Sequence, residues 1–140
     1  MPPHTYGTFT KALQAGKLEP AYYFLGAENV PKDEGTTALL DKVLDPGLRD
    51  FNLDIRSAQQ LEPEDVLSLC TTLPMMADRR VVVVRDVEAW KRKTRGKKAV
   101  LEYLQKPIPE TLLVLVQGAA SDTKDDKPDT DLAKHAYTIA

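Results

Sequence analysis

The residues with the clearest potential for chemistry lie in the stretch FLGAENVPKDEG, where a glycine precedes a lysine and an acid. This spacing can be compared with the phosphate-binding pattern G-x-x-x-x-G-K-[ST]. Gly26 and Lys32 fit it, but Pro31 stands at the second glycine and Asp33 at the Ser or Thr. Proline has no N–H to offer a phosphate, and an aspartate would repel one. We therefore predict a degenerate nucleotide site, with Lys32 as a solvated lysine at a helix start.

Two acids follow the apolar run VVVV, as in the strand that carries the magnesium-binding acid of P-loop ATPases. These acids are Asp86 and Glu88. A divergent P-loop ATPase that uses Lys32, Asp86 and Glu88 therefore stays open as an alternative. The sequence offers no Ser/His/Asp or Cys/His set, so we expect no catalytic residue, no metal and no cofactor.

Composition narrows the class of protein. A chain of 140 residues with 42% hydrophobic residues suits one globular domain, and we take residues 1–140 as that domain. A net charge of −2 argues against nucleic-acid binding through bulk electrostatics. The lone cysteine, Cys70, fits a reducing compartment, and no apolar run is long enough to span a membrane. We expect a cytoplasmic protein.

A local basic segment leaves DNA binding open as a second alternative. The run KRKTRGKK could contact phosphates, although such runs are usually flexible, solvated loops, as we expect here. Trp90, just before it, is expected to pack at the base of that loop. The basic residues of the run are Lys91, Arg92, Lys93, Arg95, Lys97 and Lys98.

Helical and strand patterns alternate along the chain. We predict helices over 8–16, 33–44, 62–73, 99–105 and 132–136, and strands over 21–25, 51–58, 81–84, 111–118 and 137–140. The run at 121–131 is predicted to be an exposed polar loop. In the strand FNLDIRSA, the alternating Phe51, Leu53 and Ile55 predict one buried face, near a sheet edge. The strands with continuous apolar runs indicate a mainly parallel sheet of roughly five strands, covered on both faces in a three-layer α/β domain.

The pair Met75 and Met76 is unusual because two large apolar side chains stand at a predicted turn. Pro74 cannot continue a helix and disfavours α geometry at Leu73, so we expect it to end the preceding helix and leave the methionines protruding. Apolar anchors bordered by Asp78 and Arg79 are typical of a binding hot spot. We predict that Leu73, Pro74, Met75, Met76 and Arg79 bind a partner.

Three stretches carry a family resemblance: YYFLGAE, SLCTTLPMMADRRVVVVRDVE and LEYLQKPIPETLLVLV. In this order they resemble the N-terminal domain of the delta subunits of bacterial DNA polymerase III. The resemblance covers about Pro20 to Ala140. It implies an AAA+-like, P-loop-type fold that has lost nucleotide binding, followed in the complete subunit by lid and collar domains that this chain does not contain.

The resemblance also implies a function without chemistry in this domain. Delta subunits belong to the clamp loader, and this domain opens the sliding clamp, the beta subunit, by inserting two apolar side chains into a pocket of the clamp. Met75 and Met76 match that pair, and Met76 stands where the family often has phenylalanine. The resemblance further implies contacts with other loader subunits through the domains outside this chain, and a monomeric isolated domain. Whether the chain counts as an enzyme stays open, because the family works within a nucleotidyltransferase holoenzyme, the DNA-directed DNA polymerase.

Overall fold

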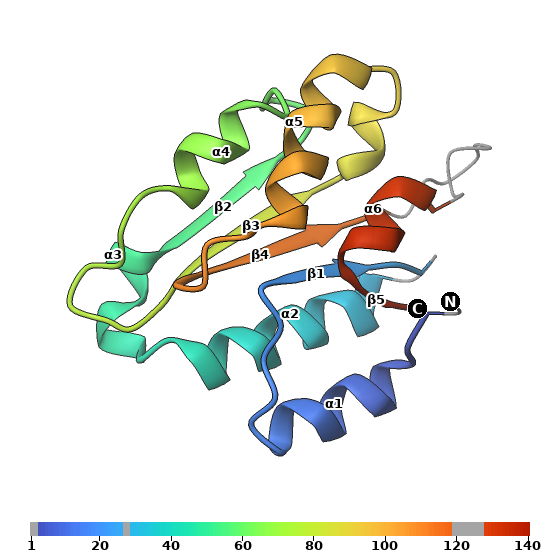
Figure 1. Cartoon of the computed structure of the whole chain (residues 1–140). Helices are drawn as coiled ribbons and strands as arrows, with labels where there is room; N and C mark the ends of the chain where they lie inside the picture. The colour runs from blue at the N-terminus through green and yellow to red at the C-terminus, as the bar shows by residue number, and fades with distance from the viewer. Residues whose placement is uncertain (1–2, 27–28, 119–127) are drawn as a thin grey trace.

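A computed structural model describes residues 3–26, 29–118 and 128–140 (Figure 1). Helices and strands alternate, as the sequence predicts, with η marking short 3₁₀ helices. In chain order the elements are α1 (Tyr6–Gln14), β1 (Ala21–Phe24), α2 (Asn29–Val43), η1 (Pro46–Leu48), α3 (Arg49–Asn52), β2 (Leu53–Ser57), α4 (Asp65–Cys70), β3 (Arg80–Arg85), η2 (Val87–Trp90), α5 (Thr94–Gln105), β4 (Thr111–Val116), α6 (Thr130–His135) and β5 (Tyr137–Ile139).

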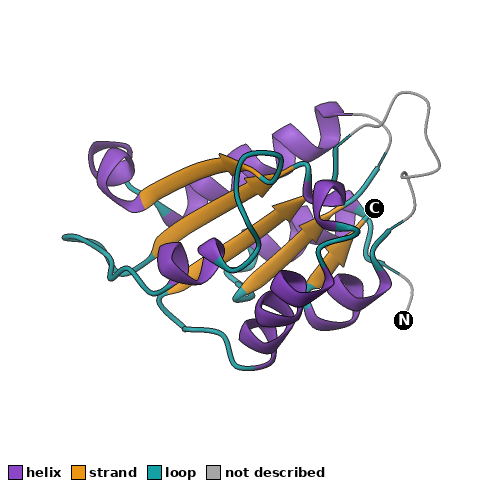
Figure 2. Ribbon diagram, turned by 90° about the horizontal axis from the view of Figure 1, so that it is seen from above, coloured by secondary structure: helices purple, strands orange, loops and turns teal. Residues whose placement is uncertain are grey.

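The described strands form one five-stranded sheet in the order β2-β3-β4-β1-β5, and each neighbouring pair is parallel. Parallel neighbours need crossover connections, and the helices supply them on both faces. Helices α1 and α2 cover one face, while α4, α5 and α6 cover the other (Figures 1 and 2). The predicted three-layer α/β class is confirmed.

The central strands are buried on both faces because successive side chains alternate between two cores. In β3, Val82 and Val84 pack into the core under α4, α5 and α6. Val81 and Val83 pack into the other core, under α1 and α2. Full burial of an aliphatic side chain of this kind contributes about 1.5–3 kcal/mol, so the four valines stabilise the sheet substantially.

The first two helices begin earlier than predicted. Helix α1 begins at Tyr6, two residues before the predicted start, and Thr5 caps it, because the Thr5 hydroxyl oxygen accepts the Thr8 N–H at 3.0 Å. Helix α2 begins at Asn29, four residues before the predicted start at Asp33. Pro31 is compatible with this start, since the first turn of a helix does not use the N–H that proline lacks.

The predicted strand over 51–58 is partly wrong. Phe51 lies in α3, and the Phe51 and Ile55 side chains, predicted to be buried, are 59% and 44% exposed. Leu53 does pack against the core under α1 and α2. Alternation identifies residues that share a face, but a sheet edge need not be covered along its whole length. The edge position of β2 is confirmed by the strand order.

Most of the predicted polar loop over 121–131 lies outside the described residues. Its last residues, from Thr130, begin α6, which Asp129 caps by accepting the Asp131 and Leu132 N–H groups. Within the described ranges, no helix combines the length and apolar character that crossing a membrane requires.

Candidate partner-binding site

Residues 71–79, which we call the apolar turn, connect α4 to β3 and extend past the amino ends of the strands (Figures 1 and 2). The exposed fractions are 78% for Leu73, 56% for Met75 and 84% for Met76. Pro74 and Arg79 are half-buried. Three large apolar side chains of one short segment therefore face solvent, whereas most others in the described chain are buried.

Helix α4 ends before the predicted position. Its last residue is Cys70, so Pro74 is not the residue that stops it. The Thr71 and Thr72 hydroxyls both donate to the Ser68 carbonyl, at 3.2 and 3.0 Å. Hydroxyls that bond the preceding turn in this way compete with continued helix. Pro74 instead lies inside the apolar turn, where its ring restricts the backbone conformation.

The backbone of the apolar turn is held by a side chain from another element. Asn52, at the end of α3, is fully buried. Its amide oxygen accepts the Met75 N–H at 2.6 Å, and its amide nitrogen donates to the Met75 carbonyl at 2.8 Å. The next residue, Met76, has a φ of 58°, a left-handed conformation that is uncommon outside glycine.

Arg80, the first residue of β3, anchors the end of the apolar turn. Its side chain is 9% exposed, and its guanidinium forms an ion pair with Asp54. It also donates to the Leu69 carbonyl at 3.2 Å and the Phe51 carbonyl at 3.4 Å. Burial lowers the pKa of Arg80 from its usual range, because desolvation disfavours the charged form. Arg80 thus ties α3, α4 and β3 together beneath the turn.

The residues of the predicted degenerate nucleotide site lie at the opposite, carboxyl end of the strands. Lys32 is 1% exposed, so its predicted solvated state is wrong. Its ammonium group donates to the Gln117 carbonyl, just after β4, at 2.5 Å. Asp33 is exposed, and Gly26 has a φ of 131°, which favours glycine. The lysine that would serve a phosphate is therefore engaged inside the protein.

The acids after β3 also have internal partners. The Glu88 carboxylate accepts the Gly118 N–H at 2.8 and 3.1 Å. Asp86 accepts a hydrogen bond from the Ser57 hydroxyl at 3.3 Å and has a left-handed φ of 60°. Among the described residues, no group of three or more His, Cys, Asp or Glu side chains is arranged to hold a metal ion.

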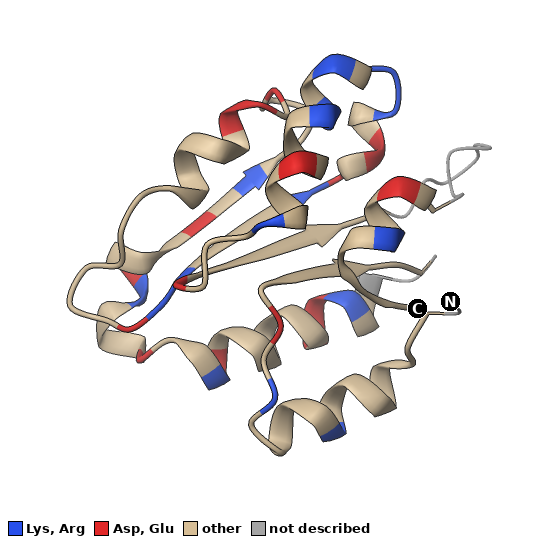
Figure 3. Ribbon diagram, viewed as in Figure 1, with Lys and Arg blue, Asp and Glu red and all other residues tan. Residues whose placement is uncertain are grey.

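The second part of the basic run lies in a helix, not in the loop that we predicted, while Lys91, Arg92 and Lys93 precede that helix. Helix α5 begins at Thr94, and blue segments gather around η2 and the start of α5 in Figure 3. Lys93 pairs with Glu62 at 2.9 Å, and Lys97 with Asp129 at 2.6 Å. The exposed members are Lys91, Arg92, Arg95 and Lys98. Trp90 packs beneath them with no exposed surface, as predicted, and donates to the Leu61 carbonyl at 2.9 Å.

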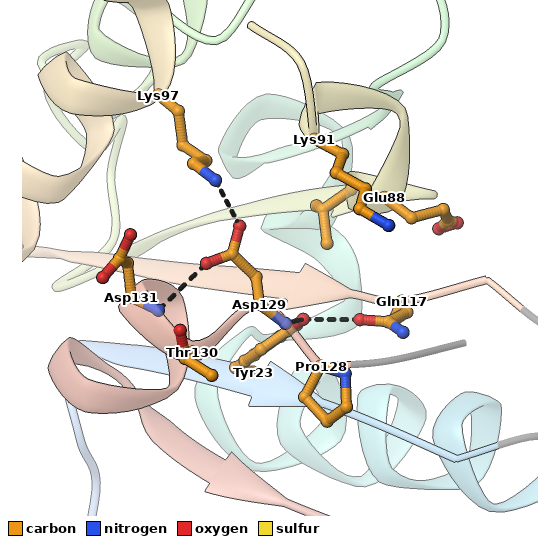
Figure 4. A pocket seen from close by; sticks show the side chains of 10 residues that line it. Tyr23, Glu88, Lys91, Lys97, Gln117, Pro128, Asp129, Thr130 and Asp131 are labelled. Carbon is orange, nitrogen blue, oxygen red and sulfur yellow. Dashed lines mark hydrogen bonds and ion pairs between the residues drawn. The ribbon is translucent and has the colours of Figure 1, made fainter. Parts of the chain in front are cut away.

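A pocket of about 300 Å³ lies beside this run (Figure 4). Internal contacts occupy several of its polar groups. The Tyr23 hydroxyl donates to the Gln117 side-chain oxygen at 2.5 Å and accepts the Asp129 N–H at 3.0 Å. Burial raises the pKa of Tyr23 to about 12, so it stays neutral at physiological pH. The pocket is thus a structural junction of β1, β4, α5 and α6.

The structure brings Leu73, Pro74, Met75, Met76 and Arg79 together in one turn, apart from both the degenerate nucleotide site and the basic run. The sequence analysis missed Asn52 as a contributor to this turn. The letters FNLD showed a strand pattern, and nothing in them indicated a partner 23 residues away.

Comparison with known proteins identifies the family. The model of the family described as "DNA polymerase III, delta subunit" matches residues 22–139. The chain belongs to this family. A curated member, DNA polymerase III subunit delta of Bacillus subtilis (strain 168), is 29% identical over 135 residues, which cover 92% of this chain and 39% of that protein. The chain thus spans about two fifths of the length of this delta subunit.

Solved structures show the same fold. The clamp loader delta protein of Bacillus subtilis superposes with a TM-score of 0.81 at 24% identity, over 96% of this chain and 42% of that one. A DNA polymerase III gamma subunit-related protein of Thermotoga maritima gives 0.68 at 12% identity, over 97% and 45%. RuvB of the same organism gives 0.57 at 12% identity, over 94% and 40%. The predicted AAA+-like fold is confirmed, and so is the resemblance to delta subunits.

Proposed function

We propose that this chain is the clamp-binding and clamp-opening domain of a delta subunit of the DNA polymerase III clamp loader. The side chains of Leu73, Met75 and Met76, with Pro74 between them, enter an apolar pocket of the sliding clamp, the beta subunit. Arg79 contacts the rim of that pocket. Residues 1–140 act as one domain in the cytoplasm and work with the other loader subunits, which hydrolyse ATP in its place.

One observation carries this proposal: the exposure of three large apolar side chains on a turn that the rest of the fold holds in place. Met76 leaves 84% of its surface in water, where an apolar side chain gains no free energy from burial. Apolar anchors of this kind contribute most of the binding free energy when a partner buries them. Methionine suits the task because its flexible, polarisable side chain adapts to an irregular pocket.

Binding leads to ring opening if the pocket of the clamp has a different shape in the closed and the open ring. A ligand shifts a conformational equilibrium only through its different affinity for the two states. A wedge that fits the pocket better when a ring interface is distorted would therefore favour the open ring. No nucleotide chemistry is needed in this domain, which agrees with Lys32 being engaged by the Gln117 carbonyl.

The test is the double substitution Met75→Ala and Met76→Ala, followed by measurement of affinity for the cognate clamp. We expect clamp binding to weaken by about 2–4 kcal/mol, the size of a hot-spot loss. Stability should change little, because both side chains are exposed. Val30→Ala is the matched control: Val30 is 63% exposed on α2, at the carboxyl end of the sheet, so its truncation should leave clamp affinity unchanged.

Equal clamp affinity in the wild type and the double variant would refute the proposed wedge. Calorimetry with ATP and Mg²⁺ tests the alternative ATPase function. Heat of binding that disappears in Lys32→Ala, with the variant still folded, would favour an ATPase over a purely mechanical domain.

A further inference from the structure

The apolar turn has little backbone support of its own. Among the described residues, no backbone–backbone hydrogen bond involves residues 73–79. Pro74 has no N–H to donate. Met76 has a left-handed φ, which costs a non-glycine residue roughly 1–2 kcal/mol. Such a conformation persists only where surrounding contacts determine it, so the support must come from outside the turn.

The Asn52 side chain supplies that support. Its oxygen and its nitrogen engage the N–H and the carbonyl of the same residue, Met75, at 2.6 and 2.8 Å. The nitrogen also donates to the Leu48 carbonyl at 3.0 Å, which fixes the rotation of the amide group. Two hydrogen bonds to one peptide residue determine its orientation as well as its position. The Met75 and Met76 side chains leave the backbone on either side of the peptide that Asn52 orients.

The backbone segment around Asn52 is itself held in place by Arg80. Arg80 donates to the carbonyl of Phe51, the residue before Asn52, and pairs with Asp54 two residues after it. Asn52 is therefore held on a segment that is tied to the start of β3. The fully buried amide is shielded from water, so its hydrogen bonds face little competition from solvent.

We infer that Asn52 is a positioning residue for clamp binding: it fixes the apolar turn in the conformation in which Met75 and Met76 are presented to the clamp. The inference rests on the proposed function and deepens it. A preformed turn avoids the entropy loss of ordering a loop when the complex forms. Asn52 itself, being buried, does not touch the clamp.

The first test compares Asn52→Leu with a matched control, Tyr23→Phe. Leucine has a similar size and removes every hydrogen bond of the Asn52 amide. Tyr23→Phe also removes buried hydrogen bonds, but at the carboxyl end of the sheet. We expect Asn52→Leu to weaken clamp binding about tenfold, the equivalent of one or two net hydrogen bonds, under conditions where circular dichroism shows both variants folded. Tyr23→Phe should change the affinity less than about twofold. Equal effects of the two variants would overturn the inference.

A double-mutant cycle separates positioning from general stabilisation. If Asn52 acts through the two methionines, Asn52→Leu should add no further loss of affinity in the Met75→Ala, Met76→Ala background. A full tenfold loss in that background would show that Asn52 influences clamp binding by another route, and would contradict the inference.

Hydrogen exchange tests the positioning role in the absence of the clamp, and the wild-type protein alone already gives a result. The Met75 N–H should exchange slowly, although its residue is 56% exposed, because Asn52 accepts its hydrogen. It should exchange rapidly in Asn52→Leu and stay slow in Tyr23→Phe. Rapid exchange in the wild type would refute the positioning role. Slow exchange together with unchanged clamp binding of the methionine double variant would refute the proposed function alone.

Discussion

Lys32 illustrates how one residue can keep a motif position while taking a different role. It stands at the lysine position of a phosphate-binding pattern, yet its ammonium group bonds the Gln117 carbonyl and its side chain is buried. A buried cation is unfavourable unless polar partners surround it. The contact links α2 to the end of β4. In this chain, therefore, Lys32 joins two elements at the place where P-loop proteins bind a nucleotide.

This structural role predicts a loss of stability in Lys32→Ala. Truncation removes a buried side chain and takes a donor from the Gln117 carbonyl, so the free energy of unfolding should fall by about 2–4 kcal/mol. Lys32→Met, which keeps most of the apolar stem, should lose less. Urea unfolding measures both, and Lys42→Ala, an exposed position on the same helix, is the control. A stability of Lys32→Ala equal to that of Lys42→Ala would contradict the structural role.

At the scale of elements, an ion pair links α5 to α6. The sequence predicted loops at both of its residues. Lys97 of α5 and Asp129, the cap of α6, are 2.6 Å apart, and their side chains are only 12% and 21% exposed. Such a pair contributes more than a solvated surface pair, since removal of one partner leaves the other partly desolvated.

Lys97→Ala should accordingly lower the free energy of unfolding by about 1–2 kcal/mol, between the values typical of surface and buried pairs. Lys98→Ala, the neighbouring exposed lysine, should change it by less than about 0.5 kcal/mol. Lysine and alanine both favour helix, so propensity alone does not separate the two variants. Equal chemical denaturation curves for the two variants would show that the ion pair contributes nothing to the docking of α6.

The elements that the sequence predicted well are those whose burial depends on local composition. Val81 to Val84 are four consecutive β-branched residues, and this local composition is enough to predict a strand buried on both faces. The predictions failed where a distant partner decides the outcome. Lys32 is buried because Gln117, 85 residues away in sequence, meets it. Phe51 is exposed because the chain turns into α3 before β2 begins.

For the candidate site, too, the features set by local sequence were predictable and those set by distant partners were not. Pro74 and two adjacent methionines indicated a protruding apolar turn from local sequence, and the observed exposure of Met75 and Met76 agrees with it. The contacts that fix the turn were not predictable. Asn52 and Arg80 form hydrogen bonds with backbone carbonyls and an N–H group of other segments. No periodicity or motif in the sequence around them identifies those partners.

Across the whole molecule, the parallel sheet separates two sites. In open parallel α/β sheets, ligands usually bind beyond the carboxyl ends of the strands, where Lys32, Asp86 and Glu88 lie in this chain. The apolar turn lies at the amino ends (Figure 1). Because the two sites share no residue, loss of the phosphate-binding pattern at one end need not disturb the partner binding that we propose at the other.

The burial of several weak acids predicts how the stability of the whole molecule depends on pH. Desolvation raises the pKa of Tyr6, Tyr23 and Tyr103 to about 12 from 10.0, and that of the Cys70 thiol to about 12 from 9.0. In the unfolded chain these groups ionise at their ordinary values, while the native state keeps them protonated. The native state therefore binds more protons between about pH 9 and pH 12. Its stability should be fully present below pH 9 and should decline as the pH rises through that window.

Urea unfolding measured at intervals from pH 7 to pH 11 checks this expectation. The free energy of unfolding should be nearly constant from pH 7 to pH 8.5, begin to fall near pH 9 as Cys70 ionises in the unfolded chain, and fall more steeply above pH 10 as the tyrosines follow. In Tyr23→Phe the decline above pH 10 should be shallower, since one of the contributing groups is gone. An increase in stability across this range, or an equally steep decline in Tyr23→Phe, would contradict the assigned burial of these groups.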